Sequence, residues 1–130
     1  MEPIQINELK EEFSIYVGHK MGHDNICYHL GGVLFSNGYE VTYMSEYYRV
    51  CINDQGIEVR EVAGEVDLTA SRDEVPIYFE VKGNYTYNGA KKAKKQLMRH
   101  LDYLNPNALT YEVYGSKEGY KAYKFDSNGR

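Results

Sequence analysis

The sequence predicts an α/β fold in which a mixed central β-sheet is flanked by helices. Alternating apolar and polar residues mark several strands, while other segments carry apolar residues at three- and four-residue intervals, as amphipathic helices do. The 14 tyrosines, with no tryptophan, favour a β-rich fold because tyrosine suits half-buried strand surfaces. With 130 residues, 42% of them hydrophobic, we expect one domain over residues 1–130 with a single core.

The first third of the chain is predicted to hold two helices. Residues 7–17 have the spacing of a short amphipathic helix. A second helix is expected to start at Asp24 and to end at Gly38, which is well placed as a C-terminal cap, although Gly31 and Gly32 weaken this prediction. Its apolar residues recur at helical spacing: Ile26, Leu30, Val33 and Leu34.

A run of strands is predicted to follow. A hairpin turn is expected at residues 53–56, whose sequence is NDQG, and a second polar connection at residues 71–74. The segments with strand character are 39–44, 47–53, 56–62, 64–70 and 76–83.

The last third is predicted to contain one helix and two strands. Asn88 is a plausible N-cap for a helix over residues 89–104, which Pro106 ends. Residues 109–115 and 120–125 read as a strand pair.

Polar residues gather on one face of the two strands that flank the 71–74 turn. Because side chains alternate across a strand, Val66 and Leu68 are expected on one face of the first strand and Asp67 on the other. The same rule places Glu80 and Lys82 opposite the apolar residues of the second strand. Two acids and a lysine are therefore predicted to meet on one surface.

A hairpin centred on the Asp-Glu pair of that turn sets Asp67 opposite Glu80 and Glu65 opposite Lys82. Cβ atoms of direct cross-strand neighbours are roughly 4.5–5.5 Å apart. Two carboxylates this close repel each other unless a cation lies between them, and Mg²⁺ or Mn²⁺ prefers such oxygen ligands. The sequence thus predicts a Mg²⁺ (or Mn²⁺) site. Lys82 would orient or help deprotonate a water there, and the carbonyl of Val81 is a further candidate ligand.

The motifs GEVD and FEVK, about a dozen residues apart, resemble the core of the PD-(D/E)XK nucleases, with Asp67, Glu80 and Lys82 at the signature positions. Glu65-Val66 stands where the family often has a small residue or proline. The helix after the lysine also resembles that of the family, which implies that Gln96 points back to the active site. The resemblance implies a restriction-endonuclease-like core and a metal-dependent enzyme that hydrolyses phosphodiester bonds in DNA.

Residues 23–41 resemble the first helix and strand of archaeal-type Holliday junction resolvases and related viral nucleases. These nucleases usually carry a glutamate in that helix; Cys27 stands there, and Asp24 is the nearest carboxylate and a candidate metal ligand. An N-cap role for Asp24 is an equal alternative, and Glu12 and Glu65 are other candidates for the additional acid. The resemblance implies an endonuclease that acts on Holliday junctions or other branched DNA as a homodimer.

Other functions remain open. The helix sequence also fits RecB- or Cas4-like exonucleases and restriction-type endonucleases, although a Cas4-type iron–sulfur cluster needs four cysteines and this chain has two. A catalytically inactive nucleic-acid-binding or protein-interaction module of the same fold is the alternative outside enzymes.

A cluster of positive charge follows the catalytic candidates in a chain whose net charge is −4. A solvated helix face is the default interpretation, yet beside a phosphodiesterase site such a cluster would bind backbone phosphates without reading sequence. These residues are Lys91, Lys92, Lys94, Lys95 and Arg99. Tyr85 and Tyr87 lie in the adjacent loop and would contact DNA or anchor the loop.

The remaining features predict no other site. Cys27 and Cys51 are expected to be free thiols, and His19, His23, His29 and His100 lack the spacing of a zinc motif, so surface or packing roles are expected. No apolar run reaches ~20 residues and no signal pattern opens the chain, so we expect a soluble cytoplasmic protein. The expected dimer surface comprises Tyr111, Tyr114, Tyr120 and Tyr123.

Overall fold

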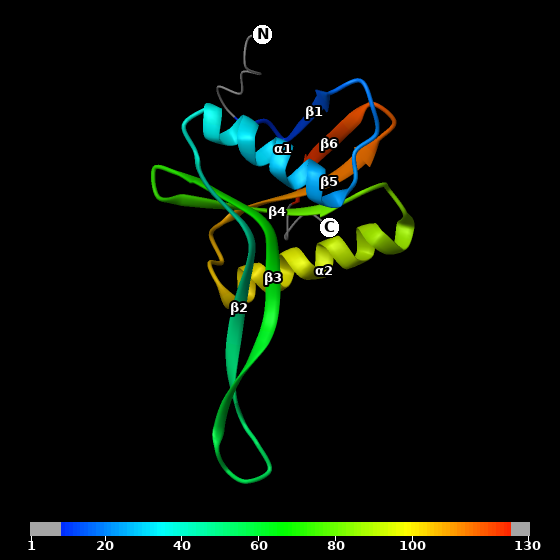
Figure 1. The fold of residues 1–130 in the computed structure, drawn as a ribbon. Coiled ribbons are helices and arrows are strands. Elements are labelled where there is room, and N and C mark those ends of the chain that lie inside the picture. Colours follow the sequence, from blue (N-terminus) through cyan, green and yellow to red (C-terminus); the bar gives the residue numbers. More distant parts are fainter. Residues whose placement is uncertain (1–8, 126–130) are drawn as a thin grey trace.

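The computed structural model describes residues 9–125, which form an α/β fold with one mixed six-stranded sheet and two helices (Figure 1). The strand order is β1-β6-β5-β4-β3-β2; β4 and β5 are parallel, and the other neighbours are antiparallel. The elements in chain order are β1 (Glu12–Tyr16), α1 (His23–Ser36), β2 (Glu40–Ile52), β3 (Glu58–Arg72), β4 (Val75–Lys82), α2 (Tyr87–Tyr103), β5 (Leu109–Ser116) and β6 (Gly119–Lys124). The predicted mixed sheet flanked by helices is confirmed.

The two helices pack against opposite faces of the sheet. On the face that α1 covers, Leu30 packs with a large apolar cluster that includes Phe79 from β4 and Val113 from β5. On the other face, Leu97 of α2 packs with Tyr78, the residue before Phe79. This arrangement follows from the alternation of side chains along β4, which sends neighbouring residues to opposite layers.

The predicted second helix is confirmed as α1, and Gly38 follows it with a φ of 89°. One of the two adjacent glycines inside this helix, Gly31, has a packing reason. A Cβ atom on Gly31 would come within 2.5 Å of the ring of Tyr43 from β2, so glycine lets that ring lie directly against the helix. Close packing therefore outweighs the cost of glycine in a helix interior, which is roughly 0.5–1 kcal/mol.

The β2–β3 hairpin is longer than predicted. The predicted segments 39–44 and 47–53 lie in β2 except for their outermost residues, 39 and 53, and the segments 56–62 and 64–70 lie in β3 except for residues 56 and 57. The turn is at the predicted place: the Asn53 side chain accepts hydrogen bonds from the backbone N–H groups of Gln55 and Ile57, each at 3.0 Å. Figure 1 shows this hairpin extending past α2 as a long twisted arm.

The predicted helix over residues 7–17 is wrong. Residues 7 and 8 lie outside the described part, and β1 occupies most of the remainder, pairing with β6 so that Ile15 faces Tyr120. Phe13 and Ile15, two residues apart, contribute to the core on the α1 side. Pairing with a strand more than a hundred residues later decides the conformation of this segment, and the local sequence holds no sign of that pairing.

The second half follows the predicted order, with one change at the start of α2. The helix begins at Tyr87, and its N-cap is Thr86, whose Oγ1 accepts a hydrogen bond from the N–H of Gly89 at 2.9 Å. Asn88 is already inside the first turn, so its predicted role as N-cap is wrong. Thr86 has the extended backbone that an N-cap residue requires.

The predicted tyrosine dimer surface is also wrong. Tyr111, Tyr114 and Tyr120 are between 1% and 5% exposed, and only Tyr123 of the four is substantially exposed. Tyr111 and Tyr120 belong to the core under α1. Three of the four tyrosines are therefore covered within this chain.

No helix within residues 9–125 has the length and apolar character needed to cross a bilayer.

Candidate active site

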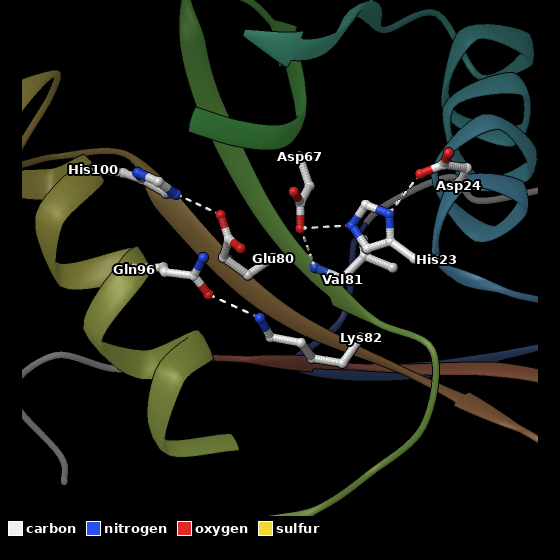
Figure 2. Close-up of polar contacts among 8 residues, drawn as sticks. All are labelled: His23, Asp24, Asp67, Glu80, Val81, Lys82, Gln96 and His100. Atoms are coloured by element: carbon white, nitrogen blue, oxygen red, sulfur yellow. Dashed lines mark hydrogen bonds and ion pairs between the residues drawn. The ribbon is translucent and has the colours of Figure 1, made fainter. Parts of the chain in front are cut away.

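β3 and β4 bring Asp67 and Glu80 together as the predicted register requires. The two strands pair from Arg72–Val75 to Leu68–Phe79, and the same register carries Asp67 opposite Glu80. Here the backbone of β4 bonds to a side chain of β3: Oδ2 of Asp67 accepts a hydrogen bond from the N–H of Val81 at 2.8 Å. Figure 2 shows the two carboxyl groups side by side between the helices.

Asp67 lies where β3 changes layers. Val66 packs with the apolar cluster under α2, whereas Leu68 packs with the cluster under α1. The expectation that these two residues share a face is therefore wrong. It assumed a regular strand, but the neighbouring strand β2 has Met44 at a φ of 48° beside this point, and the alternation breaks. The irregularity leaves Asp67 between the two layers, 8% exposed.

Glu80 is fully buried at the centre of the site. Its Oε1 lies 2.5 Å from Nε2 of His100, and its Oε2 has no hydrogen-bond partner among the described residues. Burial, reinforced by the charge of Asp67, raises the pKa of Glu80 to about 9. A carboxylate in this position therefore favours a proton or a cation beside its free oxygen.

Lys82 and Gln96 meet on the α2 side of the sheet. The Lys82 ammonium donates a hydrogen bond to Oε1 of Gln96 at 2.9 Å, so the helix fixes the end of a flexible side chain (Figure 2). The predicted proximity of Gln96 to the acids and lysine is thus present in the fold. Val81, between Glu80 and Lys82, presents its N–H to Asp67.

His23, at the start of α1, joins the helix to Asp67. Its Nε2 lies 3.2 Å from Asp67 Oδ2, and its Nδ1 lies 2.7 Å from Asp24 Oδ1. Partial burial lowers the pKa of His23, but hydrogen bonding to Asp24 and the charge of Asp67 outweigh it, so the pKa is raised overall. The structure thus connects Asp24 to the site only through the imidazole.

The candidate additional acids lie elsewhere. The Asp24 side chain is 74% exposed, and the N-cap of α1 is Gly22, so the N-cap role for Asp24 is wrong. Glu12 is on the edge strand β1, separated from β4 by β6 and β5, and Glu65 is exposed. Buried Cys27 occupies the position aligned with the family glutamate; burial, then the charges of Asp67 and Asp24, raise its pKa to about 12.

A third buried carboxylate, Glu112, lies beside Glu80 in the register of β4 and β5. It is already satisfied, because its Oε1 accepts hydrogen bonds from Lys94 at 2.7 Å and from the hydroxyl of Tyr114 at 2.6 Å. The sequence reasoning missed this residue, and it acts as an anchor for α2 through Lys94.

The predicted basic cluster is on the exposed side of α2. Lys94 forms an ion pair with Glu112, and the ammonium of Lys91 lies over the ring of Tyr87, 5.2 Å from its centroid. An open pocket on this helix is lined by Lys94, Lys95 and Arg99 together with Phe125 and other residues. Positive charge over an apolar floor suits a nucleic-acid strand.

Comparison of the chain with protein families, curated proteins and solved structures gives no match.

The acidic pair can be tested for its fit to a metal ion. No three His, Cys, Asp or Glu side chains within residues 9–125 form a group that would hold an ion. Mg²⁺, however, commonly takes only one or two protein carboxylates and completes its shell with water and substrate phosphates. Asp67 and Glu80 supply two, and the unpartnered Glu80 Oε2 is a free oxygen ligand. The donor set fits Mg²⁺ or Mn²⁺ on this basis.

Two histidines at the site were not expected there. His19 is exposed and His29 packs against Tyr120, as expected, but His23 and His100 contact the two carboxylates. One signal was present for His100: it follows Gln96 by four residues, which puts both on one helix face. No local signal marks His23, because its contact with Asp67 depends on where α1 lies on the sheet.

Proposed function

We propose that this chain is a divalent-metal-dependent deoxyribonuclease with a restriction-endonuclease-like core. The observation that carries the proposal is the convergence of Asp67, Glu80 and Lys82, with Gln96 holding the lysine (Figure 2). Acidic oxygen ligands beside a positioned ammonium group are suited to hydrolysis of a phosphodiester.

Each residue has a defined task in this proposal. Asp67 and Glu80, with the carbonyl oxygen of Val81, would hold Mg²⁺ or Mn²⁺; when bound, the ion supplies Lewis acidity and lowers the pKa of its water. Lys82, steadied by Gln96 at 2.9 Å, places positive charge where a scissile phosphate would lie.

DNA would lie along α2. Its exposed cations (Lys91, Lys92, Lys95 and Arg99) would contact backbone phosphates. Within this function, a homodimeric cytoplasmic resolvase of Holliday junctions or other branched DNA is the preferred substrate assignment, supported by the resemblance of residues 23–41. RecB- or Cas4-like exonuclease and restriction-type activities are the alternatives.

The test is a cleavage assay on labelled four-way junction, linear duplex and single-stranded DNA, with and without Mg²⁺ or Mn²⁺. We expect metal-dependent cleavage with preference for the junction. Asp67→Asn, Glu80→Gln and Lys82→Ala should each lower the rate by at least about 100-fold, since each removes several kcal/mol of transition-state stabilisation. Glu65→Gln is the matched control, because Glu65 is an exposed carboxylate two residues from Asp67, and it should cleave normally.

A rate independent of metal, or full activity of Asp67→Asn, would refute the nuclease proposal. Cutting of linear duplex as readily as junction would remove only the resolvase assignment.

A nucleic-acid-binding module without catalysis is the second candidate. It is favoured by the complete burial of Glu80 and by its short contact with His100, which together leave one carboxylate oxygen for a ligand. Salt-dependent DNA binding without cleavage under any metal condition would select this candidate.

A further inference from the structure

Glu80 is held from the α2 side by a chain of buried polar groups. His100 is 1% exposed, and its Nε2 lies 2.5 Å from Glu80 Oε1 (Figure 2). On the other side of the same ring, Nδ1 lies 2.7 Å from the hydroxyl of Tyr47, which is 8% exposed. Both ring nitrogens of His100 are therefore occupied, and the ring has one orientation that satisfies them.

The ring is also fixed by its neighbours. Tyr47 and Tyr78 both contact the His100 ring edge-on, with centroid distances of 5.4 and 6.0 Å. Tyr47 in turn depends on the glycine opposite it in β3. A Cβ atom on Gly64 would overlap the Tyr47 hydroxyl oxygen, so only glycine leaves room for this hydroxyl to reach the histidine.

The position of Glu80 follows from these contacts. Because His100 occupies Oε1, the other oxygen, Oε2, is the one left without a partner. A carboxylate anchored through one oxygen presents the second in a defined direction. Groups that orient a ligand in this way typically affect metal affinity or activity by about 10–100-fold when they are replaced.

We propose that His100 is a positioning residue for Glu80, and that Tyr47 sets the tautomer of His100. The inference rests on the proposed metal-dependent function. With Glu80 ionised, the Nε2–H of His100 donates to Oε1, and Nδ1 accepts the hydrogen bond that the Tyr47 hydroxyl donates. His100 touches neither metal nor DNA in this arrangement and acts only through the carboxylate.

Tyr47→Phe is the decisive variant because it removes one hydroxyl and keeps the ring. Tyr78→Phe is the matched control: it removes a hydroxyl from a ring that is equally buried and also packs edge-on against His100. The first measurement is Mn²⁺ affinity of the DNA-free protein by electron paramagnetic resonance. We expect Tyr47→Phe to weaken binding about tenfold and Tyr78→Phe to leave it unchanged.

The second measurement is the tautomer of His100, read from its side-chain ¹⁵N shifts with Mg²⁺ present. We expect the Nε2–H form in the parent and in Tyr78→Phe, and a mixture of tautomers in Tyr47→Phe. His100→Gln, which keeps an N–H donor, should retain more Mn²⁺ affinity than His100→Leu. Melting temperatures show which variants are folded.

The outcomes separate the two proposals. If the parent binds no Mn²⁺ and cleaves no DNA, the proposed function falls and the positioning role falls with it. If the parent binds and cleaves, but folded Tyr47→Phe matches it in Mn²⁺ affinity and tautomer, only the positioning role is refuted.

Discussion

At the scale of single residues, Asp67 links three elements. Its Oδ2 accepts a hydrogen bond from the Val81 N–H at 2.8 Å and lies 3.2 Å from His23 Nε2, so one carboxylate on β3 is tied to β4 and to the start of α1. Replacement by asparagine keeps the size of this side chain but exchanges one of its two oxygen atoms for an NH2 group. Loss of activity in Asp67→Asn must therefore be read together with a measurement of folding.

His29 predicts a pH effect on stability. Burial lowers the pKa of its ring, and the charge of His19 lowers it further, while Nδ1 lies 2.8 Å from the Tyr120 hydroxyl. The unfolded chain then binds the proton more readily than the folded chain, so the contribution of His29 is retained above its ordinary pKa of 6.5 and lost as the pH falls below it.

The variant that tests this is His29→Gln. Between about pH 8 and about pH 5, the melting temperature of the parent should fall toward that of the variant. Only the parent has a ring at this position that takes up a proton more readily in the unfolded chain. His19→Gln should show a smaller fall than the parent, because it removes the second influence that lowers the pKa of His29 and leaves the burial of the ring unchanged. Parallel curves for parent and His29→Gln would contradict the prediction.

The sequence was sufficient to predict Asp67, Glu80, Lys82 and Gln96 as neighbours, because their proximity follows from one hairpin register and the helix after it. Local pattern was insufficient for other parts of the site. Its remaining contacts come from residues distant along the chain, which meet only when the helices dock on the sheet: His23, Tyr47, His100 and Glu112.

At the scale of elements, the β3–β4 turn holds removable backbone strain. Asp73 and Glu74 have φ values of 58° and 67°, between the paired residues Arg72 and Val75. A left-handed conformation costs a residue other than glycine roughly 1–2 kcal/mol, and turns of this kind favour glycine at the second central position.

Glu74→Gly should raise the free energy of unfolding by about 1 kcal/mol, measured by urea unfolding. Gly56→Ala, at a φ of 75°, should lower it; a destabilised Glu74→Gly would count against the turn geometry.

The exposed face of α2 predicts uniform, salt-sensitive binding of DNA. Lys94 is excluded from the test because its ion pair with Glu112 supports the fold. Replacement of Lys91, Lys92 and Lys95 with glutamine should weaken binding to every DNA sequence alike and should reduce the salt slope by about one for each phosphate that is no longer neutralised. The control replaces three exposed lysines of the β5–β6 hairpin with glutamine: Lys117, Lys121 and Lys124. Equal affinities for both triple variants would show that α2 is only a solvated face.

The prediction of elements succeeded where short-range signals exist. Apolar periodicity located both helices, and turn residues located the hairpins. It failed at β1 because Phe13 and Ile15 belong to a strand only by virtue of pairing with β6. It also divided β2 and β3 into shorter pieces, since the polar and glycine residues inside them resemble strand ends.

At the scale of the whole molecule, the β2–β3 arm is where we expect the proposed dimer to form. Cross-strand partners Tyr48 and Val62 share one face with Val50 and Ile52, and each of these side chains is at least 45% exposed. A two-stranded hairpin alone is marginally stable in water, and a second copy would cover this apolar face.

Val50→Lys should shift the mass seen by light scattering from twice 15.0 kDa to 15.0 kDa. Phe35→Lys, an exposed aromatic on α1, should not; a monomeric parent would remove the dimer from the proposal.

The pairing of β1 with β6 constrains how the molecule is made. On the ribosome, Phe13 and Ile15 emerge long before Ala122 and Tyr120, the residues they face in the finished sheet. Until β6 has left the exit tunnel, the nascent chain has no strand to pair with β1, and its apolar side chains remain open to chaperones. Closure of this edge therefore waits for β6, and the non-local pairing makes it slow.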